Sequence, residues 1–283
     1  MSLQELQQLL KNKLKDLYES VELNALVNIL IEEVTGWDKL HQNIHKSDAL
    51  SEEQIGLLNQ YTTELSQGRP IQYILGKAWF MGHEFKVNEQ VLIPRPETEE
   101  LVDWVVEYAQ IIDKPLDILD IGTGSGCIAT SLSNALPTCN LNALDISEEA
   151  LQVAKYNAAK NNASVHFIHE DILHCKQLPT QYDIIVSNPP YIPWKEKENM
   201  QEQVLAHEPS LALFVEDDAP LLFYTTIATL AKKALKKNGQ LFFEIHYDQG
   251  EAILSMLDEM GYHAELRQDM YGKDRMVRAS LKA

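Results

Sequence analysis

The tetrapeptide Asn188-Pro189-Pro190-Tyr191 carries the clearest chemical signal in the sequence. It follows a predicted strand, residues 183–187, whose continuous apolar core 184–186 (IIV) is typical of a buried parallel strand. Two consecutive prolines cannot donate to a sheet ladder, and they hold the backbone extended. That rigidity can aim the Asn188 side-chain amide and the Pro189 carbonyl at a single point beyond the end of the strand.

Two acceptors aimed at one point suit transfer of a methyl group to a planar nitrogen. An amide or an aromatic amine is a poor nucleophile because its lone pair is delocalised. Acceptors on both of its N–H hydrogens would orient the nitrogen and raise its electron density, so that it can attack a sulfonium methyl group in line. Tyr191 would pack on the planar group. The alternative interpretation of the tetrapeptide is a rigid turn that ends a strand.

A glycine-rich turn, residues 120–126 (DIGTGSG), follows the first predicted strand and opens a helix. Glycines permit a tight turn and let backbone N–H groups approach a ligand closely. Such a turn can serve NAD, FAD or S-adenosylmethionine, or can simply pack a helix against a sheet. The cofactor contacts expected here come from Gly122, Thr123, Gly124, Ser125 and Gly126.

Two acidic residues stand where the next strands are predicted to end. Asp145 can accept hydrogen bonds from both hydroxyls of a ribose, although a helix N-cap is a competing role because Ser147 and a helix follow. Asp171 with Ile172 suits an adenine, since the carboxylate can bind the exocyclic amine and Ile172 can flank the ring. The competing role of Asp171 is that of an ordinary loop acid.

Strand and helix signals alternate after residue 115, which predicts an α/β fold with a mostly parallel, doubly wound, seven-stranded sheet. The last two strands are close in sequence and are expected to pair as an antiparallel edge hairpin. The predicted strands are residues 116–121, 141–146, 165–169, 183–187, 240–245, 262–266 and 276–281.

Three regions precede or contain these elements. Leucines at helical spacing predict a small helical N-terminal domain over residues 1–70, with substrate recognition as its expected role. Aromatic and β-branched residues between glycines predict a β-hairpin linker over residues 71–94. Residues 95–283 are expected to form the sheet domain with the cofactor and substrate sites. Pro96 suits the first position of its opening helix.

Composition narrows the function classes. The formal net charge of −18 disfavours direct binding of nucleic acid, because non-specific affinity for phosphates rests on Lys and Arg. No apolar run reaches the roughly 18 residues of a membrane span, and the charged N-terminus lacks the apolar region of a secretory signal. Cys127, Cys139 and Cys175 form no CxxC pair, which favours a reducing, cytoplasmic location.

The motifs occur in the order seen in the release factor glutamine methyltransferases, the HemK or PrmC family, which the sequence resembles over nearly its whole length. The resemblance implies a class I (Rossmann-like) methyltransferase fold with a helical N-terminal domain. The segments that carry it are residues 93–99 (IPRPETE), 120–126, 188–191, 208–209 (EP) and 272–275 (GKDR).

The resemblance also implies an activity. A methyl group passes from S-adenosyl-L-methionine to the side-chain N5 of the glutamine in the Gly-Gly-Gln motif of bacterial class I peptide chain release factors, leaving S-adenosyl-L-homocysteine. Residues 122–126, Asp145 and Ile172 would contact the cofactor, with aliphatic packing by Ile172 in place of the aromatic stacking common in the family. Asn188 would hold the glutamine amide and also touch the cofactor. Pro189, Pro190 and Tyr191 would complete the substrate pocket.

Two residues of the shared motifs have open roles. Arg95 would either pair with the carboxylate of the cofactor or form a structural ion pair near the acidic start of the helix. Glu208 would either help to close a loop over the site or form a surface salt bridge.

Three other functions compete. Glutamine methylation of a ribosomal protein uses the same tetrapeptide, but residues 96–99 (PETE) resemble the release-factor type. Amino-methylation of a nucleic-acid base would normally need a basic surface, whereas acidic side chains outnumber lysines in the first 90 residues. A binding module that only retains the fold is disfavoured by the intact tetrapeptide and glycine-rich turn.

Overall fold

The computed structural model describes residues 1–112, 114–200 and 202–282. It divides into two compact units, and each is described by itself. The first comprises Met1–Gly76 with Gln201–His207, and the second comprises Lys77–Met200 with Glu208–Ala283. Ala283, at the end of the expected sheet domain, lies outside the described residues.

The first unit is helical. Leu3, Leu6, Leu10 and Leu14 lie on one face of its first helix and are fully buried, so the leucine spacing read from the sequence marks a real core face. Ser51 caps the fourth helix in a capping box with Gln54. The helices are α1 (Leu3–Leu14), α2 (Ser20–Thr35), α3 (Lys39–Ile44), α4 (Glu52–Ser66), α5 (Ile71–Leu75) and α9 (Glu202–His207).

The hairpin is shorter than the expected linker of residues 71–94. Its strands are β1 (Lys77–Phe80) and β2 (His83–Lys86), and they pair antiparallel. The beginning of the expected hairpin is the helical turn α5 instead. Gly76 ends this turn in the left-handed conformation (φ 68°), which a glycine adopts at little cost, and the extended chain starts directly after it.

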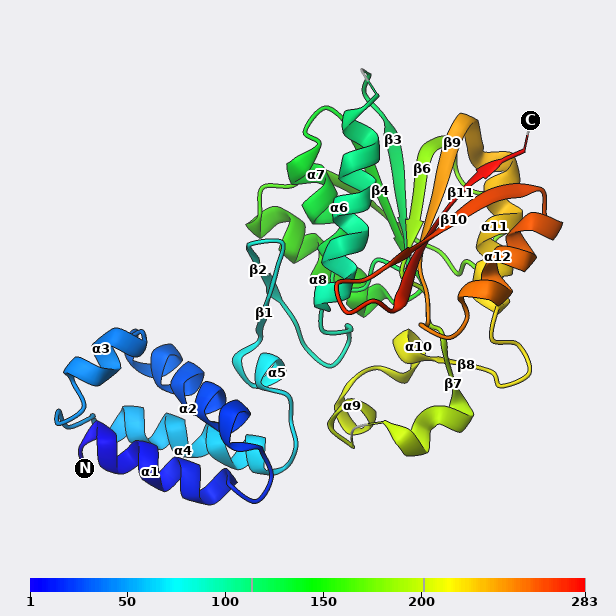
Figure 1. The fold of residues 1–283 in the computed structure, drawn as a ribbon. Helices are drawn as coiled ribbons and strands as arrows, with labels where there is room; N and C mark the ends of the chain where they lie inside the picture. Colours follow the sequence, from blue (N-terminus) through cyan, green and yellow to red (C-terminus); the bar gives the residue numbers. More distant parts are fainter. Residues whose placement is uncertain (113, 201, 283) are drawn as a thin grey trace. The chain divides into compact units, whose positions relative to one another are not determined.

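A seven-stranded sheet organises the second unit, in the order β10-β11-β9-β6-β3-β4-β5 (Figure 1). Only β11 runs antiparallel to its neighbours, β9 and β10, so the predicted parallel sheet with an antiparallel hairpin at its edge is confirmed. The strands are β3 (Asp117–Ile121), β4 (Asn140–Asp145), β5 (Val165–His169), β6 (Tyr182–Ser187), β9 (Leu235–Glu244), β10 (Tyr262–Gln268) and β11 (Asp274–Leu281).

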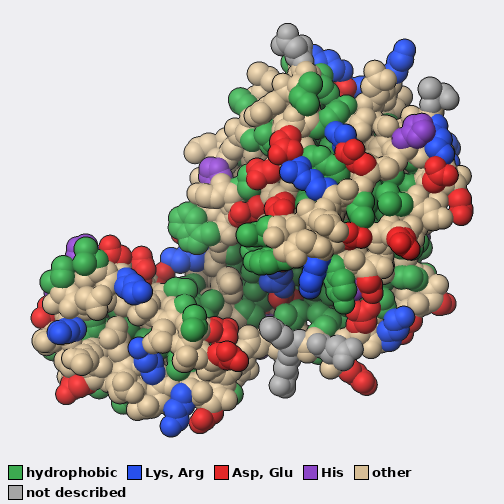
Figure 2. All heavy atoms as spheres, viewed as in Figure 1, with side chains coloured by type: hydrophobic (Ala, Val, Ile, Leu, Met, Phe, Trp, Pro, Cys, Tyr) green, Lys and Arg blue, Asp and Glu red, His purple; other side chains and the backbone are tan. Residues whose placement is uncertain are grey.

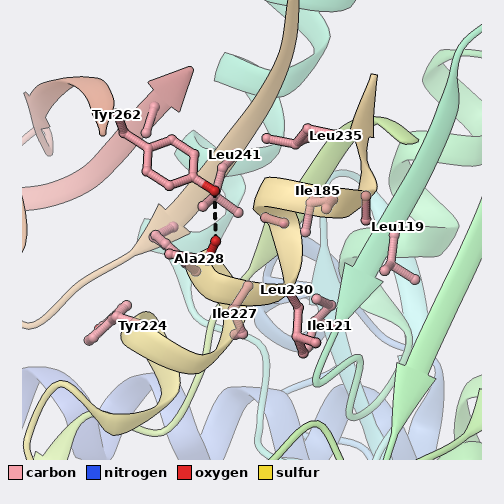
Figure 3. Close-up of a cluster of buried hydrophobic side chains, with 14 of the residues drawn as sticks. Leu119, Ile121, Ile185, Tyr224, Ile227, Ala228, Leu230, Leu235, Leu241 and Tyr262 are labelled. Carbon is pink, nitrogen blue, oxygen red and sulfur yellow. Dashed lines mark hydrogen bonds between the residues drawn. The ribbon is translucent and has the colours of Figure 1, made fainter. Parts of the chain in front are cut away.

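Helices cover both faces of this sheet, so β6 in its centre is buried along its whole length (Figure 1). On one side an apolar cluster joins the sheet to the last two helices. Figure 3 shows this cluster, in which the Tyr262 hydroxyl donates to the Ala228 carbonyl at 2.7 Å. Helices α6 (Pro96–Gln110), α7 (Cys127–Ala135) and α8 (Glu148–Lys160) lie on one face, and α11 (Leu222–Ala234) and α12 (Gly250–Glu259) on the other.

The chain between β6 and α11 forms short elements that the sequence patterns did not predict. β7 (Ile192–Pro193) pairs in parallel with β8 (Phe214–Val215), and the Trp194 ring stacks on Phe214 with centroids 4.2 Å apart. This pairing brings residues 209–212 back beside the tetrapeptide. The other elements are the 3₁₀ helix η1 (Trp194–Asn199) and α10 (Ser210–Leu213).

Within the described residues, no helix is long and apolar enough to cross a membrane. The three cysteines are free thiols, in agreement with the interpretation that they form no disulfide framework. On the face drawn in Figure 2, Lys and Arg side chains lie among acidic ones and form no continuous basic patch.

Candidate active site

A cavity of about 550 Å³ lies in the second unit at the carboxyl ends of β3, β4 and β6. Parallel sheets of this type bind their ligands at this edge, and the volume lies within the range of about 300–1,000 Å³ that is common for small-molecule sites. Its walls include three segments that were not predicted to line a ligand site, residues 90–92, 209–212 and part of α11. The lining residues predicted from the sequence are Gly122, Gly124, Asp145, Asp171, Ile172, Asn188, Pro189 and Pro190.

The glycine-rich turn forms one wall through Gly122 and Gly124. Both have positive φ angles (74° and 53°), and a Cβ added to either would meet no atom within 4 Å, so the turn borders open space. The amides of Gly122, Thr123 and Gly124 nevertheless already donate hydrogen bonds within the protein. Gly122 and Thr123 donate to the Leu144 carbonyl at 2.8 and 3.0 Å, and Gly124 donates to Asp145 Oδ2 at 2.8 Å. These three amides are therefore not available to a ligand, and the expected contact of Gly122 and Gly124 with a cofactor stays a prediction.

Three residues of the same turn do not line the cavity. Thr123 and Ser125 are buried, and the Thr123 hydroxyl donates to Asp120 Oδ2 at 2.6 Å. Gly126 lies against α8, because a Cβ at this position would come within 2.9 Å of the Ala154 Cβ. These residues shape the turn and pack its helix, so any influence on a cofactor would be indirect.

Asp145 stands at the rim of the turn with both carboxylate oxygens engaged. Oδ2 accepts from the Gly124 amide at 2.8 Å and Oδ1 from the Ser147 amide at 2.9 Å. Ser147, rather than Asp145, is the N-cap of α8, because its hydroxyl accepts from the Ala150 amide. A carboxylate offers about four acceptor positions, so Asp145 retains capacity for hydroxyl donors. Burial raises its pKa above the ordinary value.

Asp171 and Ile172 follow strand β5, and both line the cavity. The Asp171 carboxylate already accepts from the Leu173 amide at 2.9 Å and contacts His174 Nδ1 at 2.5 Å. Ile172 is only 7 % exposed and offers the cavity an apolar surface. The structure thus brings together the two strand-end acids, which are far apart in sequence, on one side of the cavity.

Three residues of the tetrapeptide line the cavity, and the fourth packs against the apolar core. Asn188, Pro189 and Pro190 line the cavity, while Tyr191 does not. The Tyr191 hydroxyl donates to Glu244 Oε1 at 3.3 Å. Burial, with the nearby Glu244 carboxylate, raises the pKa of this hydroxyl. The predicted stacking of Tyr191 on a substrate remains a prediction.

Arg95 and Glu208, whose roles the sequence left open, pair with each other. Arg95 Nη2 lies 2.6 Å from Glu208 Oε1, and the other carboxylate oxygen accepts from the Ile93 amide at 3.4 Å. The Glu208 side chain is only 2 % exposed and the Arg95 side chain is 34 % exposed, so the pair has a buried carboxylate and is not a surface salt bridge. Arg95 is absent from the cavity lining. The pair joins the two segments, residues 90–92 and 209–212, that form cavity walls.

Two further residues near the site had no predicted role. Thr98 on α6 and Glu244 at the end of β9 are almost fully buried, and the Thr98 hydroxyl donates to Glu244 Oε2 at 2.6 Å. Burial raises the pKa of Glu244 to about 7. Sequence patterns could not pair residues that lie 146 positions apart. The available signal was an acid directly after the apolar residues 241–243 (LFF) at the end of β9.

Comparison with known proteins places these features in a family. Residues 5–76 match the PrmC N-terminal domain, and residues 108–212 match the methyltransferase small domain. A release factor glutamine methyltransferase from Flavobacterium psychrophilum is 42% identical over 274 residues, which are 95% of each chain. The chain belongs to the release factor glutamine methyltransferase family. The resemblance seen in the motifs is therefore confirmed.

Other known proteins support the family and the fold. A release factor glutamine methyltransferase from Bacteroides thetaiotaomicron is 42% identical and matches 96% of this chain and 97% of its own. The crystal structure of a methyltransferase from Pyrococcus furiosus superposes with a TM-score of 0.53 at 15% identity, covering 72% of this chain and 91% of that one. At that identity the likeness speaks for the fold alone. The predicted class I methyltransferase fold is confirmed.

Proposed function

We propose that this member of the release factor glutamine methyltransferase family transfers a methyl group from S-adenosyl-L-methionine to a glutamine. The target is the side-chain N5 of the glutamine in the Gly-Gly-Gln motif of bacterial class I peptide chain release factors, and the by-product is S-adenosyl-L-homocysteine. The observation that carries the proposal is that Asn188, Pro189 and Pro190 share one cavity with the glycine-rich turn and Asp145.

The cavity fits a cofactor that contains a nucleoside. Asp145 keeps acceptor positions for ribose hydroxyls, and Ile172, Leu144 and Ile146 give the same cavity an apolar flank for a base. Gly122 leaves the space above the turn open. S-adenosylmethionine, when bound, supplies a methyl group on a positively charged sulfur, which is an electrophile that needs no metal.

The residues of the tetrapeptide orient the nucleophile. Asn188 Oδ1 and the Pro189 carbonyl accept the two N–H hydrogens of the glutamine amide, so its nitrogen is held with increased electron density. The new N–C bond forms as the bond from the methyl carbon to sulfur breaks. The nitrogen is then acidic and loses one of its hydrogens as a proton to solvent, so no strong base is required.

Charge favours a protein substrate over a nucleic acid. The net charge is −18, and the basic residues on the face in Figure 2 are dispersed. A protein of this kind would attract a phosphate backbone poorly. Release factors act in the cytoplasm, and we place the enzyme there with them.

Transfer of a radiolabelled methyl group tests the proposal. Label should enter a release factor, and should not enter the same factor after replacement of the Gly-Gly-Gln glutamine by alanine. A ribosomal-protein substrate and a DNA oligonucleotide serve as competitors. Equal labelling of the alanine variant would remove the glutamine assignment, and labelling of the oligonucleotide alone would replace it with base methylation. Asn188→Ala should bind the cofactor normally and lose most of the transfer.

A further inference from the structure

Behind the tetrapeptide lies a chain of buried polar groups that starts at Asn188. Asn188 Nδ2 donates to Thr98 Oγ1 at 3.2 Å, and the Thr98 hydroxyl donates to Glu244 Oε2 at 2.6 Å. Thr98 is 3 % exposed and Glu244 is 1 % exposed, so water does not compete for these contacts. The three residues come from α6, the end of β9 and the segment after β6.

The direction of these hydrogen bonds follows from the number of hydrogens available. A threonine hydroxyl has one hydrogen, and Thr98 gives it to Glu244. While Glu244 is ionised and accepts this hydrogen, the Thr98 oxygen can only accept toward Asn188, which requires the amide nitrogen of Asn188 to face it. The amide oxygen then points away from Thr98. Among the described residues none donates to Oδ1, and Asn188 lines the cavity.

We infer that Thr98 and Glu244 are positioning residues that fix the side-chain amide of Asn188 with its oxygen toward the substrate. The inference rests on the proposed function, because only a substrate nitrogen that donates its hydrogens benefits from this orientation. With the amide inverted, the NH₂ of Asn188 would face the NH₂ of the glutamine, and neither could accept. The same orientation disfavours a substrate atom that can only accept.

Glu244 has a second role in the same arrangement. Its other oxygen, Oε1, accepts from the Tyr191 hydroxyl at 3.3 Å, and its backbone carbonyl accepts from the Tyr224 hydroxyl at 3.2 Å. One carboxylate therefore holds both ends of the tetrapeptide, Asn188 through Thr98 and Tyr191 directly. A hydrophobic residue at the end of β9 would leave Thr98 free to donate to Asn188 and so to invert the amide.

Matched substitutions at Thr98 separate hydrogen bonding from packing. Thr98→Val keeps the shape and removes the hydroxyl, whereas Thr98→Ser keeps the hydroxyl. We expect Thr98→Val to lower kcat by about tenfold or more, the loss typical of one hydrogen bond in a transition state, with an unchanged Kd for S-adenosylmethionine. Thr98→Ser should restore most of kcat. Thr229→Val on the exposed side of α11 controls for a general effect of the exchange.

Double substitutions test whether the effect passes through Asn188. In an Asn188→Ala background Thr98→Val should cause no further loss of kcat, because no amide remains to be oriented. Added to Thr98→Val, Glu244→Leu should cause only the further loss that passes through Tyr191, while Glu244→Gln, which keeps an acceptor, should be milder than Glu244→Leu. A full additional loss from Thr98→Val in the Asn188→Ala background would overturn the inference, as would kcat of Thr98→Val equal to that of the parent.

A spectroscopic readout is independent of the substrate. With asparagine labelled by ¹⁵N, the side-chain NH₂ resonance of Asn188 is assigned by its disappearance in Asn188→Ala. Thr98→Val should shift this resonance and speed its exchange with water, and Thr98→Ser should not. An unchanged resonance in Thr98→Val overturns the inference. If the parent enzyme labels no release factor, the proposed function fails, and this readout still decides the orientation of the amide.

Discussion

Replacing Glu244 with glutamine should change how the stability of the sheet-containing unit depends on pH. Burial raises the pKa of this carboxyl from 4.5 to about 7. The hydrogen bond from Thr98 and the positive charge of Arg275 on β11 oppose the rise, and the negative charge of Glu97 on α6 adds to it. The folded protein therefore binds the Glu244 proton more tightly than the unfolded chain does.

The sign and size of the effect follow from linkage. Because the folded-state pKa is raised, the contribution of Glu244 to the unfolding free energy is most favourable below pH 4.5 and declines as the pH rises to about 7. Each tenfold difference in proton affinity corresponds to about 1.4 kcal/mol, so the total decline is on the order of 3 kcal/mol. Glutamine carries no titrating proton and lacks this decline.

Urea unfolding between pH 5 and pH 8 measures the difference. In a Trp37→Phe background all remaining tryptophans belong to the second unit, so fluorescence reports on that unit. The unfolding free energy of Glu244→Gln relative to its parent should rise with pH by an amount on the order of 3 kcal/mol. Exposed Glu251→Gln should show no such trend. A Glu244→Gln difference that is constant with pH, or that falls, would show that the pKa of Glu244 is not raised in the folded protein.

Three further substitutions test other parts of the structure. Asp145→Ala should raise the Kd for S-adenosylmethionine at least tenfold (about 1.4 kcal/mol), measured by calorimetry, because it removes the ribose acceptor and the anchor of the Gly124 amide. Gly126→Ala should destabilise the second unit by about 1–3 kcal/mol in urea unfolding, since its φ is 78° and its Cβ would crowd α8. Glu208→Ala should cost about 1–3 kcal/mol, because it removes the acceptor of Arg95 and of the Ile93 amide while the guanidinium keeps access to water, and the double variant with Arg95→Ala should cost less than the sum of the singles.

Local sequence patterns were sufficient for the sheet and for part of the site. The continuous apolar run of β6 and the glycine-rich turn after β3 are local signals, and in a parallel sheet the ends of successive strands meet at one edge. That rule placed Asp145, Asp171 and Asn188 around one cavity before their contacts were known. The order of the motifs along the chain indicated the protein family. The tetrapeptide alone indicated only the type of reaction.

Local sequence patterns could not predict contacts between segments that are distant in the sequence. The Arg95–Glu208 pair spans 113 positions and the Thr98–Glu244 bond spans 146, and neither leaves a periodic trace in the sequence. The two-residue strands β7 and β8 are too short to show a period of two, so the wall formed by residues 209–212 was not predicted. The glycine-rich pattern also could not show that the amides of Gly122, Thr123 and Gly124 donate to the Leu144 carbonyl and to Asp145.

Mass spectrometry of a release factor incubated with the enzyme and S-adenosylmethionine shows whether the tetrapeptide holds the glutamine amide. We expect one added methyl group on the side chain of the Gly-Gly-Gln glutamine, and almost none when Asn188→Ala is used at a cofactor concentration that saturates both proteins. An unmodified glutamine, or equal methylation by Asn188→Ala, would contradict the assignment of the tetrapeptide as the group that holds the glutamine amide.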